Sequence, residues 1–247
     1  MRANSLLRQA LTLNPETVLD VGGAGSGHAI AFISNGAKVL SIDPRHTDLT
    51  HKNYQHEQSP YEEVDLEDKF DVVWCSHVLE HIPNVQHFLV TLYGWLKDDG
   101  YLCIAVPPDR QRRLHVGHLT LWTPAHLAYN LVCAGYDCKD AIWYTEYLSI
   151  GMMVQKKPCI DLSWRTGLPN ELSNLNLYMP KVIRHEDGAW WGNNWPEELE
   201  AYRASDPPCV TIGASKTNLP PDIQLAFGPN PELRDKYKRE EWHETRD

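Results

Sequence analysis

The sequence lacks any run of about 20 apolar residues, the length that a membrane-spanning helix needs. Its six cysteines include no C-x-x-C pair, which argues against a zinc ribbon or a disulfide framework and predicts reduced, buried thiols. Positive charge is also scarce: 23 Lys and Arg residues stand against 33 Asp and Glu residues, for a formal net charge of −10. Such a charge repels a phosphate backbone, and the one dense basic cluster, Arg110, Arg112 and Arg113, is short. We expect a cytoplasmic protein without export signal, membrane anchor or nucleic-acid partner.

Apolar patterns divide the chain into a domain at residues 1–157 and a C-terminal extension at residues 158–247. In the first part, strand-like apolar runs alternate with helix-like ones, as in a parallel α/β sheet. The strands are expected at 17–21, 37–42, 70–75, 101–106, 141–144 and 148–155, and the helices at 6–13, 26–36, 85–96 and 125–134. The extension is rich in Pro, Asn, Gly and Trp, and only 197–203 and 232–242 have a helical pattern.

Glycines fill the turn after the first predicted strand. The stretch Asp20-Val-Gly-Gly-Ala-Gly-Ser-Gly27 lies between a strand and a helix, where the chain must turn sharply and a ligand can approach the backbone closely. The second strand ends at Asp43, at about the distance at which an acidic residue meets a ribose. A carboxylate there can accept two hydrogen bonds from a vicinal diol. These features predict a nucleoside-containing cofactor, although a tight turn alone also needs glycines.

Four segments, in order, resemble the motifs of class I S-adenosylmethionine-dependent methyltransferases: 18–27, Asp43, 70–83 and 95–100. The resemblance covers about residues 15–157 and implies a Rossmann-like, doubly wound sheet of seven strands, the last one antiparallel. It also implies S-adenosylmethionine as the cofactor, with Asp43 on the ribose hydroxyls and Asp65 near the adenine. Around the methionine moiety it places Asp20, Gly22, Gly23, Ala24, Gly25 and Gly27. The loop departs from the family pattern, because the spacing from Asp20 to Gly27 is one residue longer than usual.

The chemistry is expected beyond the carboxyl ends of the strands, where ligands of open α/β sheets bind. Cys75, Ser76 and His77 follow one strand and residues 107–109 follow another, so both groups should line the site. Methyl transfer to oxygen or nitrogen is an in-line displacement, in which the enzyme positions the acceptor and can remove its proton. The candidate bases are His118, His115, Glu80, His81 and Asp109. His118 is favoured, because it precedes a Thr-Pro element resembling one that borders the acceptor pocket of many family members; a loop or cap role is the alternative.

His77-Val-Leu-Glu-His81 also spells H-x-x-E-H, a metalloprotease signature when it lies on a long helix. Here it straddles a strand end and a short turn cut by Pro83, so the sequence predicts no metal.

The acceptor is the least constrained part of the prediction. We expect methyl transfer to oxygen or nitrogen of a small polar acceptor, with a sugar or sugar nucleotide as one candidate. The extension holds Trp190, Trp191 and Trp195, whose rings could stack on an acceptor or simply anchor the extension. An inactive cofactor-binding scaffold subunit and a nicotinamide (NAD-type) enzyme are the alternatives, and a homo-oligomer is compatible with the sequence.

Overall fold

A computed structural model describes residues 3–108, 115–146, 149–162, 177–180, 184–186 and 189–191. The first half contains α1 (Asn4–Thr12), β1 (Thr17–Val21), α2 (Gly27–Ser34), β2 (Lys38–Ile42), β3 (Tyr54–Glu57) and the short helix η1 (Tyr61–Glu63). The second half contains β4 (Phe70–Ser76), the short helix η2 (Leu79–His81), α3 (Val85–Trp95), β5 (Leu96–Val106), α4 (Pro124–Cys133), β6 (Ile142–Glu146) and β7 (Ser149–Gln155). A separate hairpin of β8 (Arg184–Glu186) and β9 (Ala189–Trp191) follows.

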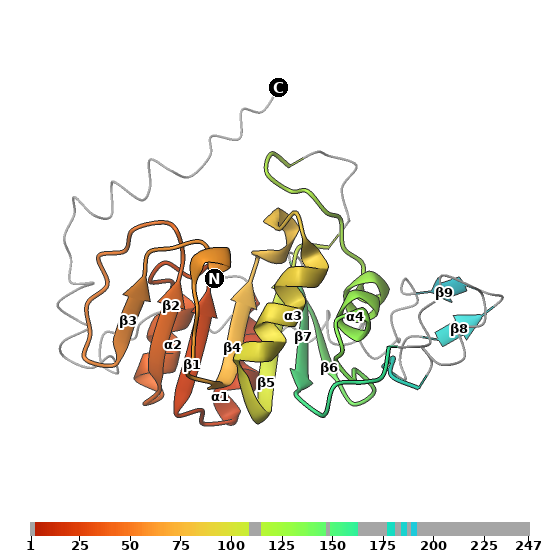
Figure 1. The fold of residues 1–247 in the computed structure, drawn as a ribbon, viewed down its shortest axis with the longest axis horizontal. Coiled ribbons are helices and arrows are strands. Elements are labelled where there is room, and N and C mark those ends of the chain that lie inside the picture. Colours follow the sequence, from red (N-terminus) through yellow and green to blue (C-terminus); the bar gives the residue numbers. More distant parts are fainter. Residues whose placement is uncertain are drawn as a thin grey trace.

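Seven strands form one mixed sheet in the order β3-β2-β1-β4-β5-β7-β6. The first five run parallel, whereas β7 is antiparallel to both β5 and β6. Figure 1 shows the arrowheads of β1, β3 and β4 at the upper edge of the sheet and that of β7 at the lower edge. This topology confirms the predicted doubly wound sheet with an antiparallel last strand.

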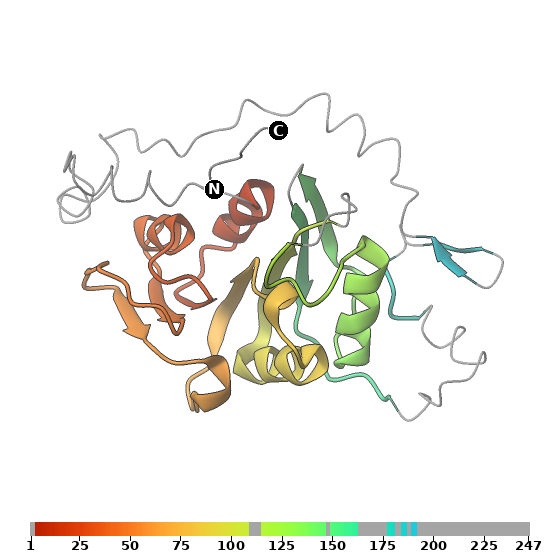
Figure 2. The ribbon, with the colours of Figure 1, turned by 90° about the horizontal axis from the view of Figure 1, so that it is seen from above.

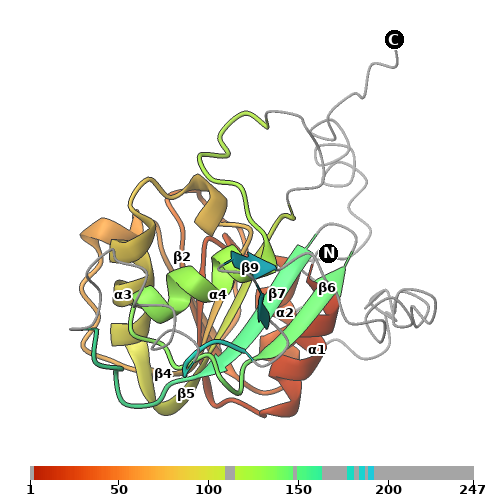
Figure 3. The same ribbon diagram turned by 90° about the vertical axis from the view of Figure 1, so that its right-hand side faces the viewer.

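Helices cover both faces of the sheet and enclose two apolar clusters. Side chains alternate along β4: Val72 and Trp74 belong to the cluster with α1 and α2, and Val73 and Cys75 to the cluster with α3 and α4. Figures 2 and 3 show the resulting three layers from above and from the side. Because both faces are buried, the strands read as continuous apolar runs in the sequence.

Local signals explain where the helices begin. The side chain of Ser26 accepts hydrogen bonds from the backbone N–H groups of His28 and Ala29, which caps α2. Thr123 caps α4 in the same way, and Pro124 occupies its first turn, where a missing N–H costs nothing. The capping residues of α2 and α4 thus lie in the turns at the carboxyl edge of the sheet, where each helix begins.

Two elements differ from the sequence-based expectation. β3 is not predicted, because Tyr-Gln-His-Glu has no apolar alternation and becomes a strand only by pairing with β2 at the sheet edge. β5 begins at Leu96 rather than Tyr101, and its pairing with β4 changes register between Phe70 and Val72. Residues 97–100, between the two registers, are therefore an irregularity within a longer strand.

Most described cysteines are buried, and none of the described ones forms a disulfide. Cys75, Cys103, Cys133 and Cys138 are buried, as predicted, but the prediction is wrong for Cys159, which is exposed. In the described residues no helix is long and apolar enough to cross a membrane.

Part of the extension packs onto the domain, where Ile160 and Met179 join the core under α3 and α4. Several predictions lie outside the described residues: the helices at 197–203 and 232–242, Trp195, and the basic cluster with Asp109.

Candidate functional site

Asp20 is the residue before the end of β1, and its side chain is buried, only 1% exposed. The hydroxyl of Ser26 donates to its Oδ2 at 3.3 Å, which ties the acid to the start of α2. Burial raises the pKa of Asp20 from 3.8 to about 7, the Ser26 hydrogen bond lowers it in part, and the charge of Asp43 adds to the rise. A cation placed beside this acid would lower its pKa and stabilise the folded protein, since a positive charge favours the ionised form.

The glycines after Asp20 form a cradle that side chains would fill. A Cβ at Gly23 would lie 1.9 Å from Asp20 Oδ2, and a Cβ at Gly22 would lie 2.2 Å from Val78 Cγ2. Gly25 is equally close to Thr47 and has a φ of +72°, which side chains rarely adopt. The loop thus requires glycine at these positions and leaves its backbone open to a ligand, as a cofactor-binding turn does.

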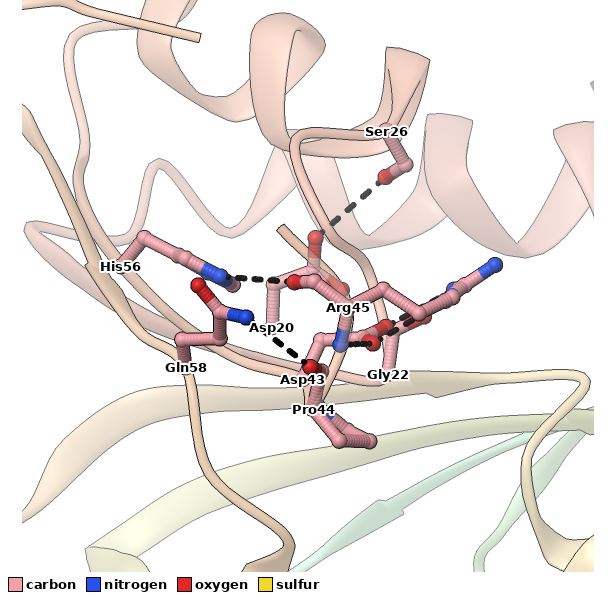
Figure 4. Close-up of polar contacts among 8 residues, drawn as sticks. All are labelled: Asp20, Gly22, Ser26, Asp43, Pro44, Arg45, His56 and Gln58. Atoms are coloured by element: carbon pink, nitrogen blue, oxygen red, sulfur yellow. Dashed lines mark hydrogen bonds and ion pairs between the residues drawn. The ribbon is translucent and has the colours of Figure 1, made fainter. Parts of the chain in front are cut away.

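Asp43 stands just beyond β2 and is 2% exposed. The guanidinium of Arg45 donates to both of its oxygens, from Nε at 3.0 Å and from Nη2 at 2.8 Å, and Nη2 also reaches the carbonyl of Gly22 at 3.1 Å (Figure 4). His56 and Gln58 hold the backbone of this loop through the carbonyls of Arg45 and Pro44. Because the Arg45 side chain is 72% exposed, it can leave the carboxylate without disturbing the core.

A cavity of about 410 Å³ opens beside these residues. Gly22 and Asp43 line one side of it, η1 contributes Tyr61 and Glu62, and the β4–α3 connection contributes His77 and His81. Its size is that of a small-molecule site, and it lies at the carboxyl edge next to β1, where the strand order reverses. The cavity, the glycine cradle and the buried carboxylates together fit a cofactor with a nucleoside and a cationic part.

A second polar group begins where β4 ends. His77 has a φ of +57°, an unusual backbone conformation for a non-glycine residue, and its Nε2 lies 2.8 Å from the hydroxyl of Ser149 on β7. Its Nδ1 lies 3.4 Å from Oε1 of Glu80, which is only 1% exposed. A strained backbone conformation, with the ring held by a hydrogen bond to another strand, is typical of a functional position.

The segment after β5 folds back over η2 and brings two more histidines to this group. The backbone N–H of Leu119 donates to the carbonyl of Glu80 at 2.7 Å, and the carbonyl of Gly117 lies 2.8 Å from His81 Nδ1. The ring of His118 then meets the ring of His81 at 5.0 Å, and the ring of His115 at 5.1 Å. Burial lowers the pKa of His118; Glu80 opposes this, and the neighbouring histidines add to it. His118 is therefore a neutral imidazole near pH 7.

The structure brings most of the predicted site residues to one edge of the sheet, although their roles remain predictions. Asp20, the glycine loop and Asp43 form one group, and His77, Glu80, His81, His118 and His115 form the second. Cys75 instead packs in the apolar core, where burial raises its pKa well above the ordinary value. Asp65 is exposed and does not line the cavity, whereas Glu62 does.

Several residues of the site belong to no motif that the sequence shows. Arg45, Tyr61 and Glu62 lie between Asp43 and Phe70, where the apolar pattern is weak. Ser149 could be placed next to His77 only by knowing that β7 lies beside β5. The spacing of Arg45 two residues after Asp43 is the one local clue that was available.

Comparison with known proteins gives one family and several relatives. Residues 2–134 match the family model described as a methyltransferase domain. Ubiquinone biosynthesis O-methyltransferases from Rickettsia felis and Rickettsia akari are 34% and 33% identical over 97 residues, which cover 36% of this chain and 40% and 39% of theirs. The chain thus matches well under half the length of these relatives. Among solved structures, Burkholderia thailandensis 1,6-didemethyltoxoflavin-N1-methyltransferase is similar at a TM-score of 0.53 and 22% identity, over 63% of this chain and 80% of that one.

Proposed function

Because the chain belongs to the class I S-adenosylmethionine-dependent methyltransferase family, we propose that it transfers a methyl group from this cofactor to an oxygen or nitrogen of a small acceptor. The observation that carries the proposal is the pair of buried carboxylates, Asp20 and Asp43, beside the cavity at the ends of β1 and β2. S-adenosylmethionine carries an ammonium and a sulfonium group, and buried acids favour such charges. An acid such as Asp43 binds the ribose in nicotinamide enzymes as well, so Asp20 is the residue that favours S-adenosylmethionine, because a buried acid beside the glycine loop disfavours a pyrophosphate there.

Each group of the site has a part in this reaction. Asp43 would hold the ribose hydroxyls after Arg45 moves aside, and Asp20 with the glycine cradle would hold the methionine end. S-adenosylmethionine supplies an electrophilic methyl group on sulfur. In the second polar group, His118 is neutral near pH 7 and can accept the proton that the acceptor loses. The carboxylate of Glu80 would stabilise the imidazolium that forms.

The loop that carries His118 also bears on the acceptor. Val116, Leu119 and Leu121 are exposed apolar side chains on this loop, at 89%, 60% and 64%. They favour an acceptor that has an apolar or aromatic part next to its hydroxyl or amino group. A sugar or sugar nucleotide, which the sequence suggests, is the second class to be tested.

Calorimetric titration with S-adenosylmethionine tests the cofactor site first. The wild type should bind one equivalent, and Asp43→Asn should weaken binding about tenfold or more, because a charge-assisted pair of hydrogen bonds is lost. Asp48→Asn is the matched control, since Asp48 is an exposed carboxylate paired only with His46 among the described residues. Equal affinity in all three proteins would contradict the placement of the ribose at Asp43.

Transfer itself is measured by mass spectrometry on two acceptor panels, phenols and aromatic amines in one and sugars and sugar nucleotides in the other. A product 14 mass units heavier identifies the acceptor class. Saturable cofactor binding without transfer to either panel would favour the inactive scaffold.

A further inference from the structure

Three side chains of the second polar group are arranged like the ligands of a metal ion. One ligand atom from each of Glu80, His81 and His118 lies within 4.8 Å of the other two. Ligands of a tetrahedral zinc ion lie about 3.3 Å apart, because each bond is about 2.0–2.1 Å long. His81 is exposed and His118 half-buried, so small rotations of their rings can close the difference.

His81 has the hydrogen bond that a ligating histidine normally has. Its Nδ1 lies 2.8 Å from the carbonyl oxygen of Gly117, which can only accept, so Nδ1 carries the proton. The lone pair is then on Nε2, which points toward Glu80 and lies 3.9 Å from its Oε1. A backbone carbonyl that fixes the tautomer and orientation of an imidazole is the usual second layer of a metal site.

Glu80 provides a second, independent indication. It is 1% exposed, yet its Oε2 is a buried oxygen with no hydrogen-bond partner among the described residues. A buried carboxylate without full pairing is costly, and a bound cation is one of the few groups that offsets the cost. No lysine or arginine among the described residues forms an ion pair with it; the side chains nearest its Oε1 are the imidazoles of His77 and His81.

We propose that Glu80, His81 and His118 bind one divalent transition-metal ion at the edge of the cavity. Two imidazoles and one carboxylate suit zinc, iron or cobalt, whereas magnesium and calcium prefer oxygen ligands alone. Neutral imidazoles are the ligating form, so binding of the metal should weaken on acidification. The sequence predicts no metal at the H-x-x-E-H motif, and this proposal differs from that prediction. It includes Glu80 and His81 of the motif, but the third ligand is His118 and not His77.

Three protein ligands leave coordination positions open, and this part of the inference rests on the proposed function. A hydroxyl of the acceptor that bound in an open position would release its proton to solvent water more easily, because the cation would stabilise the resulting oxyanion. In that case His118 would be a metal ligand, and water would take the proton in place of His118. The loop residues around Gly117 would then close the site through the hydrogen bond to His81.

Titration of the tag-free, chelator-treated full chain with Zn²⁺, and with Co²⁺ as a spectroscopic probe, tests the site. We expect one equivalent to bind, with the visible absorption of Co²⁺ in a low-coordinate protein site. Glu80→Gln and His118→Ala should each weaken binding tenfold or more. His126→Ala, which removes an exposed imidazole from the first turn of α4, should change affinity less than twofold.

Binding of S-adenosylhomocysteine is measured on the same variants, so that loss of the metal is distinguished from loss of the fold. Retained nucleoside binding with weakened metal binding in Glu80→Gln and His118→Ala supports the site. The proposal is overturned by no saturable Zn²⁺ binding, by binding that these variants leave intact, or by binding of Mg²⁺ in preference to Zn²⁺. None of these results would affect the cofactor site, which Asp43→Asn tests separately.

Discussion

Asp20 should destabilise the cofactor-free protein at neutral pH, and Asp20→Asn should relieve this cost. Burial raises the pKa of Asp20 from 3.8 to about 7, so ionising it in the folded state is unfavourable. The difference corresponds to about 4 kcal/mol of unfolding free energy. Asparagine has the same shape and can still accept the hydrogen bond from Ser26, but it carries no charge.

The sign of the pH dependence follows from the two pKa values. Well below pH 3.8 the acid is protonated in both states and costs nothing. As the pH rises toward 7, the unfolded chain loses this proton while the folded chain keeps it, so the folded state loses stability. The stability advantage of Asp20→Asn should therefore grow by about 1.4 kcal/mol per pH unit between about pH 4.5 and 6.5, and level off above pH 7.

Urea denaturation of wild type and Asp20→Asn across pH 4.5 to 8 measures the difference between their unfolding free energies. The contributions of the other titrating groups are common to both proteins and cancel in this difference. Asp71→Asn is the matched control. Burial raises the pKa of Asp71, but hydrogen bonds from Lys97 and Thr17 outweigh this and lower it overall, so Asp71 is ionised in both states over this range. Its effect should be independent of pH from 4.5 upward. Parallel curves for Asp20→Asn and wild type would refute the reasoning.

The same substitution should abolish most of the stabilisation that the cofactor gives. In the wild type, a cationic ligand offsets the cost of the ionised acid, so the apparent melting temperature should rise on binding. In Asp20→Asn this rise should be small although the unliganded protein is more stable. Asp20→Asn should therefore raise the stability of the unliganded protein and weaken cofactor binding, as is expected when a residue serves binding at the expense of stability.

Three further predictions concern single positions. Gly23→Ala would place a methyl group 1.9 Å from the Asp20 carboxylate and should weaken S-adenosylmethionine binding at least tenfold by calorimetry. Gly94→Ala is the control: its Cβ would have open space in α3, and the substitution should raise the free energy of unfolding by up to ~1 kcal/mol. Arg45→Ala frees the carboxylate beyond β2 and should tighten cofactor binding a few-fold; weaker binding would mean that the guanidinium contacts the ligand. Methyl transfer should decline on acidification below pH 6.5, since burial lowers the pKa of His118, and His118→Gln should remove this decline.

The sequence was sufficient for the parts of the fold that local physics decides. Strands such as β4 are apolar on both faces, so they appear as uninterrupted runs between turn residues. The Asp20 loop needs glycine for steric reasons that hold within a few residues, and Asp43 follows from the end of β2. These features depend on neighbours close in the chain.

The remaining parts depend on neighbours far away in the chain. β3 has a polar sequence and gains its structure from β2. Glu80 and His118 stand 38 positions apart, and their approach depends on how the segment after β5 folds back over η2. Asp65 is predicted from its place in the sequence alone; it lies exposed, whereas Glu62, three residues earlier, lines the cavity.

The position of β7 has a consequence for how the chain is made. β7 pairs with β5 along residues 101–106 and lies between β5 and β6, so that edge of β5 has no partner until residue 155 has been synthesised. The edge is apolar, with Leu102, Ile104 and Val106 in the core, and unpaired apolar edges attract other chains. The matched family segment ends at residue 134, before this hairpin. A fragment cut there would therefore aggregate, and on the ribosome the sheet can close only after its last two strands emerge.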